Sequence, residues 1–598
     1  MSFPDLRAFI DQLRRANDIV TVDVPVDPRL EIAEIHRRVI AAGGPALLFT
    51  NVTGSDFRLV TNLFGTARRA EIAFGQRPMQ LVRRIVQLAE ELLPPSAAGL
   101  WSARDVGFEL FKIGSRRVGN GPIVERMTSD VRLDRLPVLT CWPDDGGPFI
   151  TLPLVYTTHP DRRGHNLGMY RMQVHGPHTA GMHWQIGKGG GFHYAVAEAR
   201  GQLLPATVFL GGPPALILSA VAPLPENVPE LLLASLIAGE RVPQVHGHGP
   251  HPLIATAEFA LVGEVPPHMR KPEGPFGDHY GYYSLQHDYP VFEVRRIAHR
   301  ADAIFPATVV GKPRQEDFFV GDLLQELLSP LFPLVMPAVE QLWSYGETGY
   351  HSLAAAVVKQ RYKREAMASA FRILGEGQLS LTKFLLVTDR HVDVRDFRAT
   401  LEHVLARTNT ETDLYVFSNL SMDTLDYTGP AVNEGSKGVW LGLGEPVREL
   451  PRQFTAAVPP GVADVRVFCA GCLVVGTAAY AAEPDAATRI ACERAFGNWP
   501  LIVITDEANR ASASSMNFLW TTFTRFEPAA DIHAAERRIV RNHIAYRGPI
   551  VIDARLKPGF PSELSCRDDI ARLVTRRWKE YFPGATVEMG DSDRAHLD

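Results

Sequence analysis

Hydrophobic and polar positions follow three different patterns along the chain, and the first predicts mixed helices and strands. Residues 1–20 are amphipathic with a helical period, because the apolar side chains fall on one face, at Leu6, Phe9, Ile10 and Leu13. Helical patterns at residues 31–44 and 79–93 then alternate with a short apolar run at 46–52. We therefore expect an N-terminal α/β domain over residues 1–125.

The second pattern covers residues 126–318, where β-rich runs are short and are separated by glycine and proline, as at 151–159, 205–211 and 251–265. It predicts an antiparallel sheet or split β-barrel. In residues 319–598, helical and strand-like segments alternate again, which predicts a parallel α/β layer. The expected fold class is therefore α/β, or α+β overall, with the split barrel in the centre.

The composition is that of a folded protein without a dominant charge. Hydrophobic residues make up 45% and charged residues 22% of the 598 residues, which are ordinary globular values. Lys and Arg number 62 against 67 Asp and Glu, so the formal net charge is only −5. No long run of like charges occurs, and we expect neither a nucleic acid nor an anionic membrane as partner.

The N-terminus and the cysteines predict a cytoplasmic protein. Charged residues interrupt the first helical pattern, unlike the apolar core of a signal peptide. Pro, Gly or charged residues break each apolar stretch before it reaches the roughly 18 residues of a membrane span. The five cysteines are too few, and odd in number, for a disulfide framework.

The segment 271–283, KPEGPFGDHYGYY, carries the strongest chemical signal. Glu273 and Asp278 flank a Gly-Pro-Phe-Gly turn that cannot lie inside a helix, so both carboxyls can converge on one point. Paired carboxyls push their pKa values apart, which suits proton transfer. The alternative is a turn whose acids are solvated or cap a helix.

The segment 165–175, HNLGMYRMQVH, is a second candidate. Asn166 offers a neutral oxygen to a hard cation, and Arg171 offers a planar fork to a carboxylate or phosphate, both on a predicted strand. A single arginine on a strand is more often a surface or ion-pair residue.

Three further patterns have both a functional and a structural interpretation. The loop with His246, His248 and His251 clusters imidazoles but lacks the spacing of a zinc site. Cys469 and Cys472 lie in an apolar run and are expected to be buried structural residues. The glycines of residues 187–192 either form an anion-binding nest before a helix or belong to a surface loop.

Four segments, taken in order, resemble the UbiD family of reversible (de)carboxylases. They are the Asn-x4-Arg of NLGMYRMQV, the stretch LSAVAPLPENVPE ending at Glu230, EGPFGDHYGYY, and GSKGVWLGLG around Lys437. The likeness runs from residue 5 to about residue 445. Residues after about 450 resemble longer members that act on phenolic and fused-ring acids.

The resemblance implies a prenylated FMN cofactor, a divalent cation such as Mn²⁺, and K⁺. Arg171, Glu273 and Asp278 would be catalytic, and Asn166 and Glu230 would ligate the cation. The family's third ligand is a histidine, but Gly187 stands at that position; His193 is the nearest replacement and His183 the other candidate. Cofactor contacts would come from Gly168, Met169, Tyr170, Arg171, Lys188, Ala220, Val221, Ala222 and Glu230.

The implied reaction is non-oxidative decarboxylation, or the reverse carboxylation, of an aromatic or α,β-unsaturated acid, with a mono- or bicyclic aromatic acid favoured. A flavin prenyltransferase would supply the cofactor, and the protein would form a homodimer or homohexamer. A split-barrel flavin oxidoreductase or a flavin carrier is the alternative function. A metal-dependent hydrolase using the histidine loop ranks behind both, because the ligand spacing is poor.

Overall fold

The chain forms two compact units. The computed structural model describes residues 3–91, 113–162, 164–184, 189–224, 228–312, 314–584 and 586–591. The first unit comprises Met1–Leu327 together with Glu563–Asp593, and the second begins at Leu328 and ends at Ser562. The chain therefore leaves the first unit once and returns to it after the second. The three domain boundaries expected from the sequence remain predictions.

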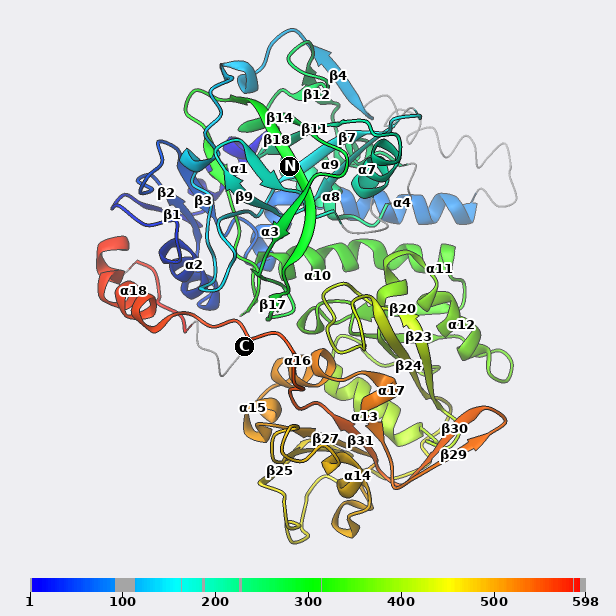
Figure 1. Ribbon diagram of the computed structural model, residues 1–598. Helices are drawn as coiled ribbons and strands as arrows, with labels where there is room; N and C mark the ends of the chain where they lie inside the picture. Colours follow the sequence, from blue (N-terminus) through cyan, green and yellow to red (C-terminus); the bar gives the residue numbers. More distant parts are fainter. Residues whose placement is uncertain are drawn as a thin grey trace. The chain divides into compact units, whose positions relative to one another are not determined.

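The first unit begins with mixed helices and strands, as expected (Figure 1). A four-stranded sheet has the order β1-β2-β3-β19, and helices pack around it. All four apolar residues expected on one face of the first helix are buried, and Asp5 caps that helix by accepting a hydrogen bond from the Ala8 N–H. The elements are α1 (Leu6–Arg15), β1 (Ile19–Val22), α2 (Glu31–Ala41), β2 (Ala46–Phe49), β3 (Arg58–Thr61), α3 (Ala67–Phe74), α4 (Arg77–Glu91) and β19 (Ile304–Pro306).

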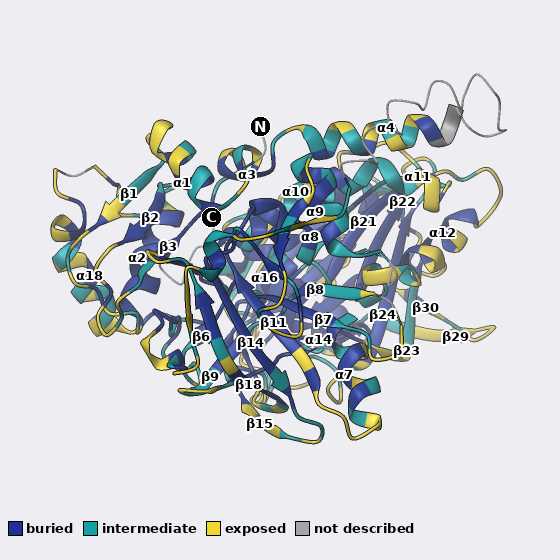
Figure 2. Ribbon diagram, turned by 90° about the horizontal axis from the view of Figure 1, so that it is seen from above, coloured by how far each residue is buried: buried dark blue, intermediate teal, exposed yellow. Residues whose placement is uncertain are grey.

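A ten-stranded, largely antiparallel sheet forms the centre of the first unit. Its main path is β6-β9-β10-β18-β14-β11-β7-β8, and β5 and β15 also pair with β18. Figure 2 shows β11 and β14 mostly in dark blue, as expected for strands at the middle of the sheet. The strands are β5 (Arg126–Thr128), β6 (Phe149–Ile150), β7 (Leu154–Thr158), β8 (His165–Met169), β9 (Met172–Gly176), β10 (Thr179–Gly181), β11 (Leu204–Leu210), β14 (Phe259–Val265), β15 (Arg270–Glu273) and β18 (His287–His299).

The order of these strands requires the sheet to curl. Strand β8 lies at one end of the path and β9 lies next to the other end, yet only Tyr170 and Arg171 separate them in sequence. A flat sheet of this width cannot be bridged by two residues, because neighbouring strands are about 4.8 Å apart. The sheet therefore closes on itself near Arg171. The expected central split barrel is confirmed, whereas Arg171 lies between two strands and not within one.

Smaller elements complete this unit. A three-stranded sheet has the order β13-β12-β4, and a short hairpin pairs β16 with β17. Within the described residues, the glycines 189–191 lie in a helix, so the surface-loop interpretation is wrong for them. The elements are β4 (Ser115–Val118), α7 (Gly189–Ala199), α8 (Pro214–Val221), α9 (Glu230–Ala238), β12 (Val242–Val245), β13 (Leu253–Ile254), β16 (Phe276–Gly277), β17 (Tyr283–Ser284) and α18 (Asp568–Tyr581).

The returning segment closes the first unit on two sides. Helix α18 packs on α2, where Arg38 donates to the Ala571 carbonyl at 3.0 Å and Glu31 accepts from Arg577 and Tyr581. Just before α18, the Leu564 N–H donates to the Gly281 carbonyl at 3.0 Å. The returning segment therefore holds both the N-terminal sheet and the loop that follows β16.

The second unit contains two α/β sheets, which confirms the expected parallel layer. One has the order β20-β21-β22-β24-β23, the other β25-β26-β27-β31-β28, and the inner strands of each are parallel. The elements are α10 (Glu316–Leu328, beginning in the first unit), α11 (Phe332–Val335), β20 (Val339–Ser344), β21 (Leu353–Val358), α12 (Glu365–Leu374), β22 (Phe384–Thr388), α13 (Phe397–Arg407), β23 (Leu414–Ser421), β24 (Glu434–Gly442), β25 (Asp464–Cys469), β26 (Cys472–Gly476), α14 (Ala486–Ala491), β27 (Leu501–Thr505), α15 (Ala508–Ser512), α16 (Ser515–Arg525), α17 (Pro528–Asp531), β28 (Ile532–His533), β29 (Glu536–Val540), β30 (His543–Arg547) and β31 (Ile550–Asp553).

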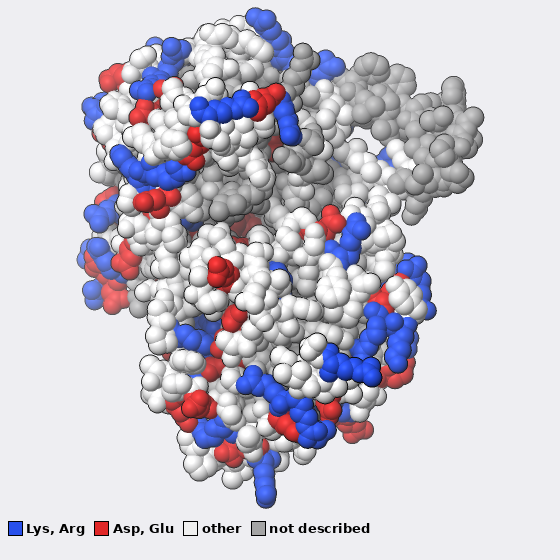
Figure 3. Space-filling view, turned by 45° about the vertical axis from the view of Figure 1, so that its right-hand side comes forward, with Lys and Arg blue, Asp and Glu red and all other residues white. Residues whose placement is uncertain are grey.

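The helical stretch Glu316–Val335 is long and apolar enough to cross a membrane, with 20 residues and a mean hydropathy of 1.4. The sequence pattern predicted an interruption here, but the helical conformation continues across the prolines of this stretch. A single helix that passes this test of length and composition does not by itself establish a membrane span. On the face drawn in Figure 3, Lys and Arg side chains lie interspersed with Asp and Glu side chains.

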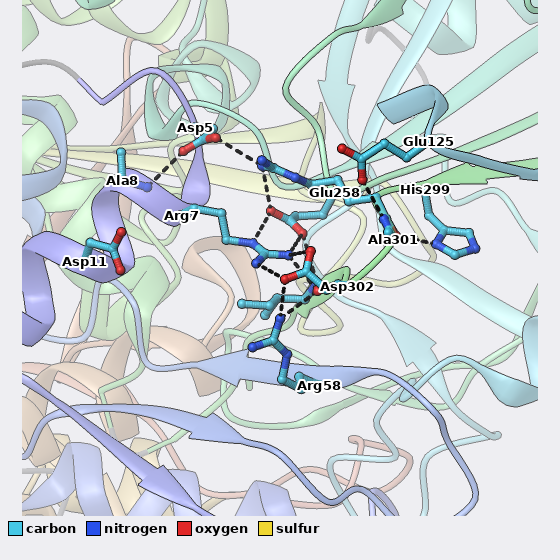
Figure 4. Close-up of polar contacts among 12 residues, drawn as sticks. Asp5, Arg7, Ala8, Asp11, Arg58, Glu125, Glu258, His299, Ala301 and Asp302 are labelled. Carbon is cyan, nitrogen blue, oxygen red and sulfur yellow. Dashed lines mark hydrogen bonds and ion pairs between the residues drawn. The ribbon is translucent and has the colours of Figure 1, made fainter. Parts of the chain in front are cut away.

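An ion-pair cluster ties α1 to the central sheet (Figure 4). The fully buried Glu258 carboxylate accepts from Arg7 Nε at 2.8 Å, from Arg300 at 3.3 Å and from the Ile304 N–H at 2.9 Å. Arg7 also pairs with Asp302, whose side chain is 68% exposed. Glu258 is therefore the centre of the cluster, and Asp302 lies at its solvent-exposed edge.

We expect Glu258→Ala to lower the free energy of unfolding by about 3–5 kcal/mol, because it removes the fully buried carboxylate that Arg7 and Arg300 share and leaves each arginine with a single, more exposed partner, Asp302 or Asp5. Asp302→Ala, the matched control, removes an exposed partner and should cost less than about 1 kcal/mol. Urea unfolding of the two variants measures both values. Equal losses would contradict this account of the cluster.

Candidate active site

The curled sheet places Arg171 between two carboxylates that are far from it in sequence. Its Nε donates to Glu273 Oε1 at 3.0 Å, its Nη1 donates to Asp278 Oδ2, and its Nη2 donates to Ser284 Oγ at 3.2 Å. The guanidinium also lies over the Phe276 ring, 4.7 Å from the ring centre. The three predicted catalytic residues are thus brought into direct contact.

The turn between Glu273 and Asp278 is fixed by side chains from outside it. Gly274 has φ +97°, a conformation that disfavours residues with a Cβ, and its N–H donates to Gln173 Oε1 at 2.8 Å. The Gly277 N–H donates to Asp145 Oδ1 at 2.8 Å. Both acids therefore project from a backbone held at both glycines, as the sequence pattern indicated.

Electrostatics keep this group of three residues charged. Burial opposes a charge on Arg171, but the Asp278 and Glu273 carboxylates outweigh burial and raise the pKa of Arg171. Burial also opposes ionisation of Glu273 and Asp278, but Arg171 outweighs it, so the pKa of each carboxyl lies below its usual range. In the free protein, Asp278 is therefore a carboxylate bound to Arg171.

Two histidines extend the group. His183 Nδ1 lies 2.9 Å from Glu273 Oε1, and His279 Nδ1 lies 2.7 Å from Asp278 Oδ1. The sequence pattern suggested His183 only as a cation ligand and gave His279 no role. The contact of His183 with Glu273 spans 90 positions, so the sequence pattern alone does not reveal it. His279 directly follows its partner Asp278 in the sequence.

Two partly buried acids lie near the group, and the sequence pattern gives neither of them a role. Asp145 accepts from the N–H groups of Cys141, Trp142 and Gly277, and burial raises its pKa to about 6. Burial also raises the pKa of Asp317, on α10, to about 6, and the nearby Asp278 charge adds to this shift while His279 opposes it. The Asp-Asp-Gly-Gly turn at 144–147 is the one sequence signal for Asp145.

A second cluster lies at the start of β8. Asn166 Nδ2 donates to Glu230 Oε1 at 2.7 Å, and the Leu167 N–H donates to Glu230 Oε2 at 2.9 Å. The Tyr170 hydroxyl donates to Asn166 Oδ1 at 3.1 Å and accepts from the Gly190 N–H at 3.3 Å. Burial raises the pKa of Glu230, and the hydrogen bond from the Leu167 N–H partly offsets this rise. Two of the three predicted cation ligands are therefore in direct contact.

His193 lies beside this pair but does not touch it. Its Nδ1 is 2.8 Å from Thr157 Oγ1, and Thr157 is the cross-strand partner of Asn166. Burial, with His159 and His165 nearby, lowers the pKa of His193 to about 4, so its imidazole is neutral. Within the described ranges, no group of three His, Cys, Asp or Glu side chains is placed to hold a metal ion.

The other predicted cofactor contacts lie around the same strand. Gly168 and Met169 end β8, Ala220 and Val221 end α8, and Ala222 caps α8. A Cβ on Gly168 would come within 2.4 Å of the Tyr170 hydroxyl, so glycine is required there. Gly187 and Lys188 lie outside the described residues.

The remaining motifs do not join either cluster. His246 is exposed, whereas His251 is buried against Thr207, with 3.1 Å between its Nδ1 and Thr207 Oγ1. Cys469 and Cys472 face each other across a hairpin and are buried and free, which confirms the structural interpretation.

All three domains that define the UbiD family match this chain. The N-terminal domain of 3-octaprenyl-4-hydroxybenzoate carboxy-lyase matches residues 10–89, its Rift-related domain residues 116–313, and its C-terminal domain residues 318–442. The chain belongs to the UbiD family of carboxy-lyases.

Relatives of similar length extend the match beyond residue 442. A protein of Chlamydia trachomatis is 49% identical over 97% of this chain and 100% of its own length. A 4-hydroxybenzoate decarboxylase component of Chlamydia pneumoniae is 50% identical over 98% of this chain and 99% of its own length.

Solved structures show the same fold at lower identity. The vanillic acid decarboxylase of Sedimentibacter hydroxybenzoicus in its closed form has a TM-score of 0.65 at 23% identity, covering 77% of this chain and 96% of that one. HmfF of Pelotomaculum thermopropionicum in complex with FMN has a TM-score of 0.62 at 22% identity, covering 76% of this chain and 98% of that one.

Proposed function

We propose that this protein decarboxylates, and in reverse carboxylates, a mono- or bicyclic aromatic acid with prenylated FMN as cofactor. The observation that carries the proposal is Arg171, whose side chain is only 11% exposed and is held on two sides by Glu273 and Asp278. A guanidinium fork of this kind recognises a carboxylate with two parallel hydrogen bonds. Membership of a carboxy-lyase family and the 4-hydroxybenzoate decarboxylase relative support the choice of reaction.

Asp278 occupies the edge of Arg171 that a substrate carboxylate would take. When the substrate binds, its carboxylate replaces Asp278 Oδ2 on Nη1, while Glu273 keeps Nε in place. A buried carboxylate that loses its cation has a raised pKa and takes up a proton. Asp278 is then a neutral acid beside the reacting carbon and delivers the proton that replaces CO2.

The residues around β8 fit a flavin phosphate. A Cβ at Gly189 would lie 2.6 Å from Asn166 Nδ2, and a Cβ at Gly190 would lie 2.6 Å from Trp184 Nε1, so only glycine lets α7 begin this close to both side chains. The first-turn N–H groups of a helix favour anions. Trp184 Nε1 is a buried donor without an acceptor among the described residues. When bound there, prenylated FMN would accept the electron pair of the breaking C–C bond.

The same cluster would also hold a divalent cation. Asn166 Oδ1 and the Glu230 carboxylate are hard oxygen donors, the type that Mn²⁺ prefers, with K⁺ as the expected second ion. His193 is the proposed third ligand, since its imidazole is neutral and its helix begins beside Asn166.

The test compares protein made with and without a co-expressed flavin prenyltransferase. Only the first preparation should release CO2 from a panel of hydroxybenzoates, naphthoates, heteroaromatic acids and cinnamate. Mass spectrometry of the bound flavin and metal analysis report the cofactor content of each preparation. Full decarboxylation with only unmodified FMN bound would contradict the proposal, and turnover of cinnamate alone would contradict the aromatic substrate class.

A further inference from the structure

His183 is a buried imidazole with one nitrogen that no part of the described chain satisfies. The residue is only 6% exposed, and its Nε2 has no hydrogen-bond partner among the described residues. A buried polar atom without a partner is destabilising, so a bound group is expected to pair with it.

The neighbours of His183 fix its tautomer. Glu273 is ionised beside Arg171 and can only accept, so the 2.9 Å contact of its Oε1 with His183 Nδ1 requires a proton on Nδ1. Burial, with Arg171 close by, lowers the pKa of His183 and keeps the ring neutral. Its Nε2 therefore carries a lone pair and acts as an acceptor.

The ring is also fixed in orientation. The backbone N–H of His183 donates to the Arg171 carbonyl at 3.3 Å. The imidazole packs on the Tyr289 ring, with 4.2 Å between the ring centres. Arg171 uses its own nitrogens on Glu273, Asp278 and Ser284. The partner of Nε2 is therefore a hydrogen-bond donor from outside the described residues.

A substrate carboxylate cannot be that partner, because carboxylate oxygens and Nε2 both accept. Glu273 Oε2 is a second buried acceptor without a donor among the described residues. His183 and Glu273, which contact each other, therefore each present one unpaired acceptor atom. The ligand must therefore offer an O–H or N–H in addition to the carboxylate that Arg171 would hold.

We propose that His183 is a specificity-determining residue whose Nε2 accepts a hydrogen bond from a hydroxyl group on the aromatic ring of the substrate. This inference rests on the proposed decarboxylase function and assigns the substrate class to hydroxylated aromatic acids. The N3–H of the flavin ring could donate to Nε2 in the same way as a substrate hydroxyl. The experiment below distinguishes a hydroxyl donor from the flavin N3–H.

Two variants split the contacts of His183. In His183→Asn the amide replaces Nδ1–H toward Glu273 but offers no acceptor at the Nε2 position, whereas His183→Gln places an oxygen near Nε2 and loses the Glu273 contact. The ligands are matched pairs, 4-hydroxybenzoate with benzoate and 6-hydroxy-2-naphthoate with 2-naphthoate. Dissociation constants and kcat/KM are measured on holoenzyme made with the prenyltransferase, together with flavin content.

Wild-type holoenzyme should prefer at least one hydroxylated acid over its partner by about 10–100-fold. His183→Asn should reduce this ratio to within about threefold at unchanged flavin content, and His183→Gln should retain part of it. A ratio that is unchanged in His183→Asn overturns the inference, and loss of flavin at an unchanged ratio assigns Nε2 to the flavin instead. If wild type binds with the preference but turns over no acid, the proposed function fails and the assignment of His183 stands.

Discussion

Asp278→Asn should lower kcat about 10²–10⁴-fold while the protein keeps its flavin. Asparagine retains the size of the side chain and can still accept from Arg171, but it has no proton to give when the substrate takes its place on the guanidinium. Stopped-time assays of CO2 release on holoenzyme measure the loss, and the absorbance of the bound flavin measures retention.

The matched control for this variant is Asp134→Asn, which changes an exposed carboxylate paired with Arg132 and should leave kcat unchanged. Deuterium incorporation from D2O into the product gives a second readout. If Asp278→Asn turns over at the wild-type rate, the proton comes from another group, and Asp317, whose pKa burial raises to about 6, is the next acid to test.

Arg171→Lys should lower kcat/KM about 30–1000-fold although the positive charge is kept. The guanidinium bonds Glu273, Asp278 and Ser284 through three different nitrogens, and an ammonium cannot reproduce that planar arrangement. Loss of one charge-assisted contact in the transition state costs about 2–4 kcal/mol, which corresponds to the expected drop.

Arg132→Lys is the matched control, because it makes the same exchange in an exposed ion pair and should have no effect on kcat/KM. Circular dichroism and flavin content establish that Arg171→Lys folds and binds cofactor. Wild-type kcat/KM in that variant would place Arg171 outside the reaction.

The sequence was most informative where chemistry and backbone constraint coincide. Glu273 and Asp278 were predicted to converge because glycine and proline leave few conformations to the turn between them, and that turn is held as expected. The convergence of these two acids can be predicted from the local sequence. Their contact with Arg171 cannot, because it depends on a sheet that closes between β8 and β9, and the pairing of strands far apart in the sequence leaves no local pattern.

Residues that act through distant partners leave no local signal in the sequence. The contact of His183 with Glu273 is such a case, because the two residues are 90 positions apart. The glycines 189 and 190 were left open between a nest and a loop, because glycine is a weak helix former; tertiary packing on Asn166 and Trp184 decides in favour of a helix. The sequence pattern predicts the helix α18, but it does not predict that α18 packs on α2.

The return of residues 563–593 to the first unit sets an order for biosynthesis. A ribosome makes these residues after the whole second unit, so neither the α2–α18 contact nor the bond from Leu564 to Gly281 can form while that unit is being translated. N-terminal domains commonly fold as soon as they emerge. Here the loop that carries Asp278 obtains its bond from Leu564 only once the returning segment has left the ribosome.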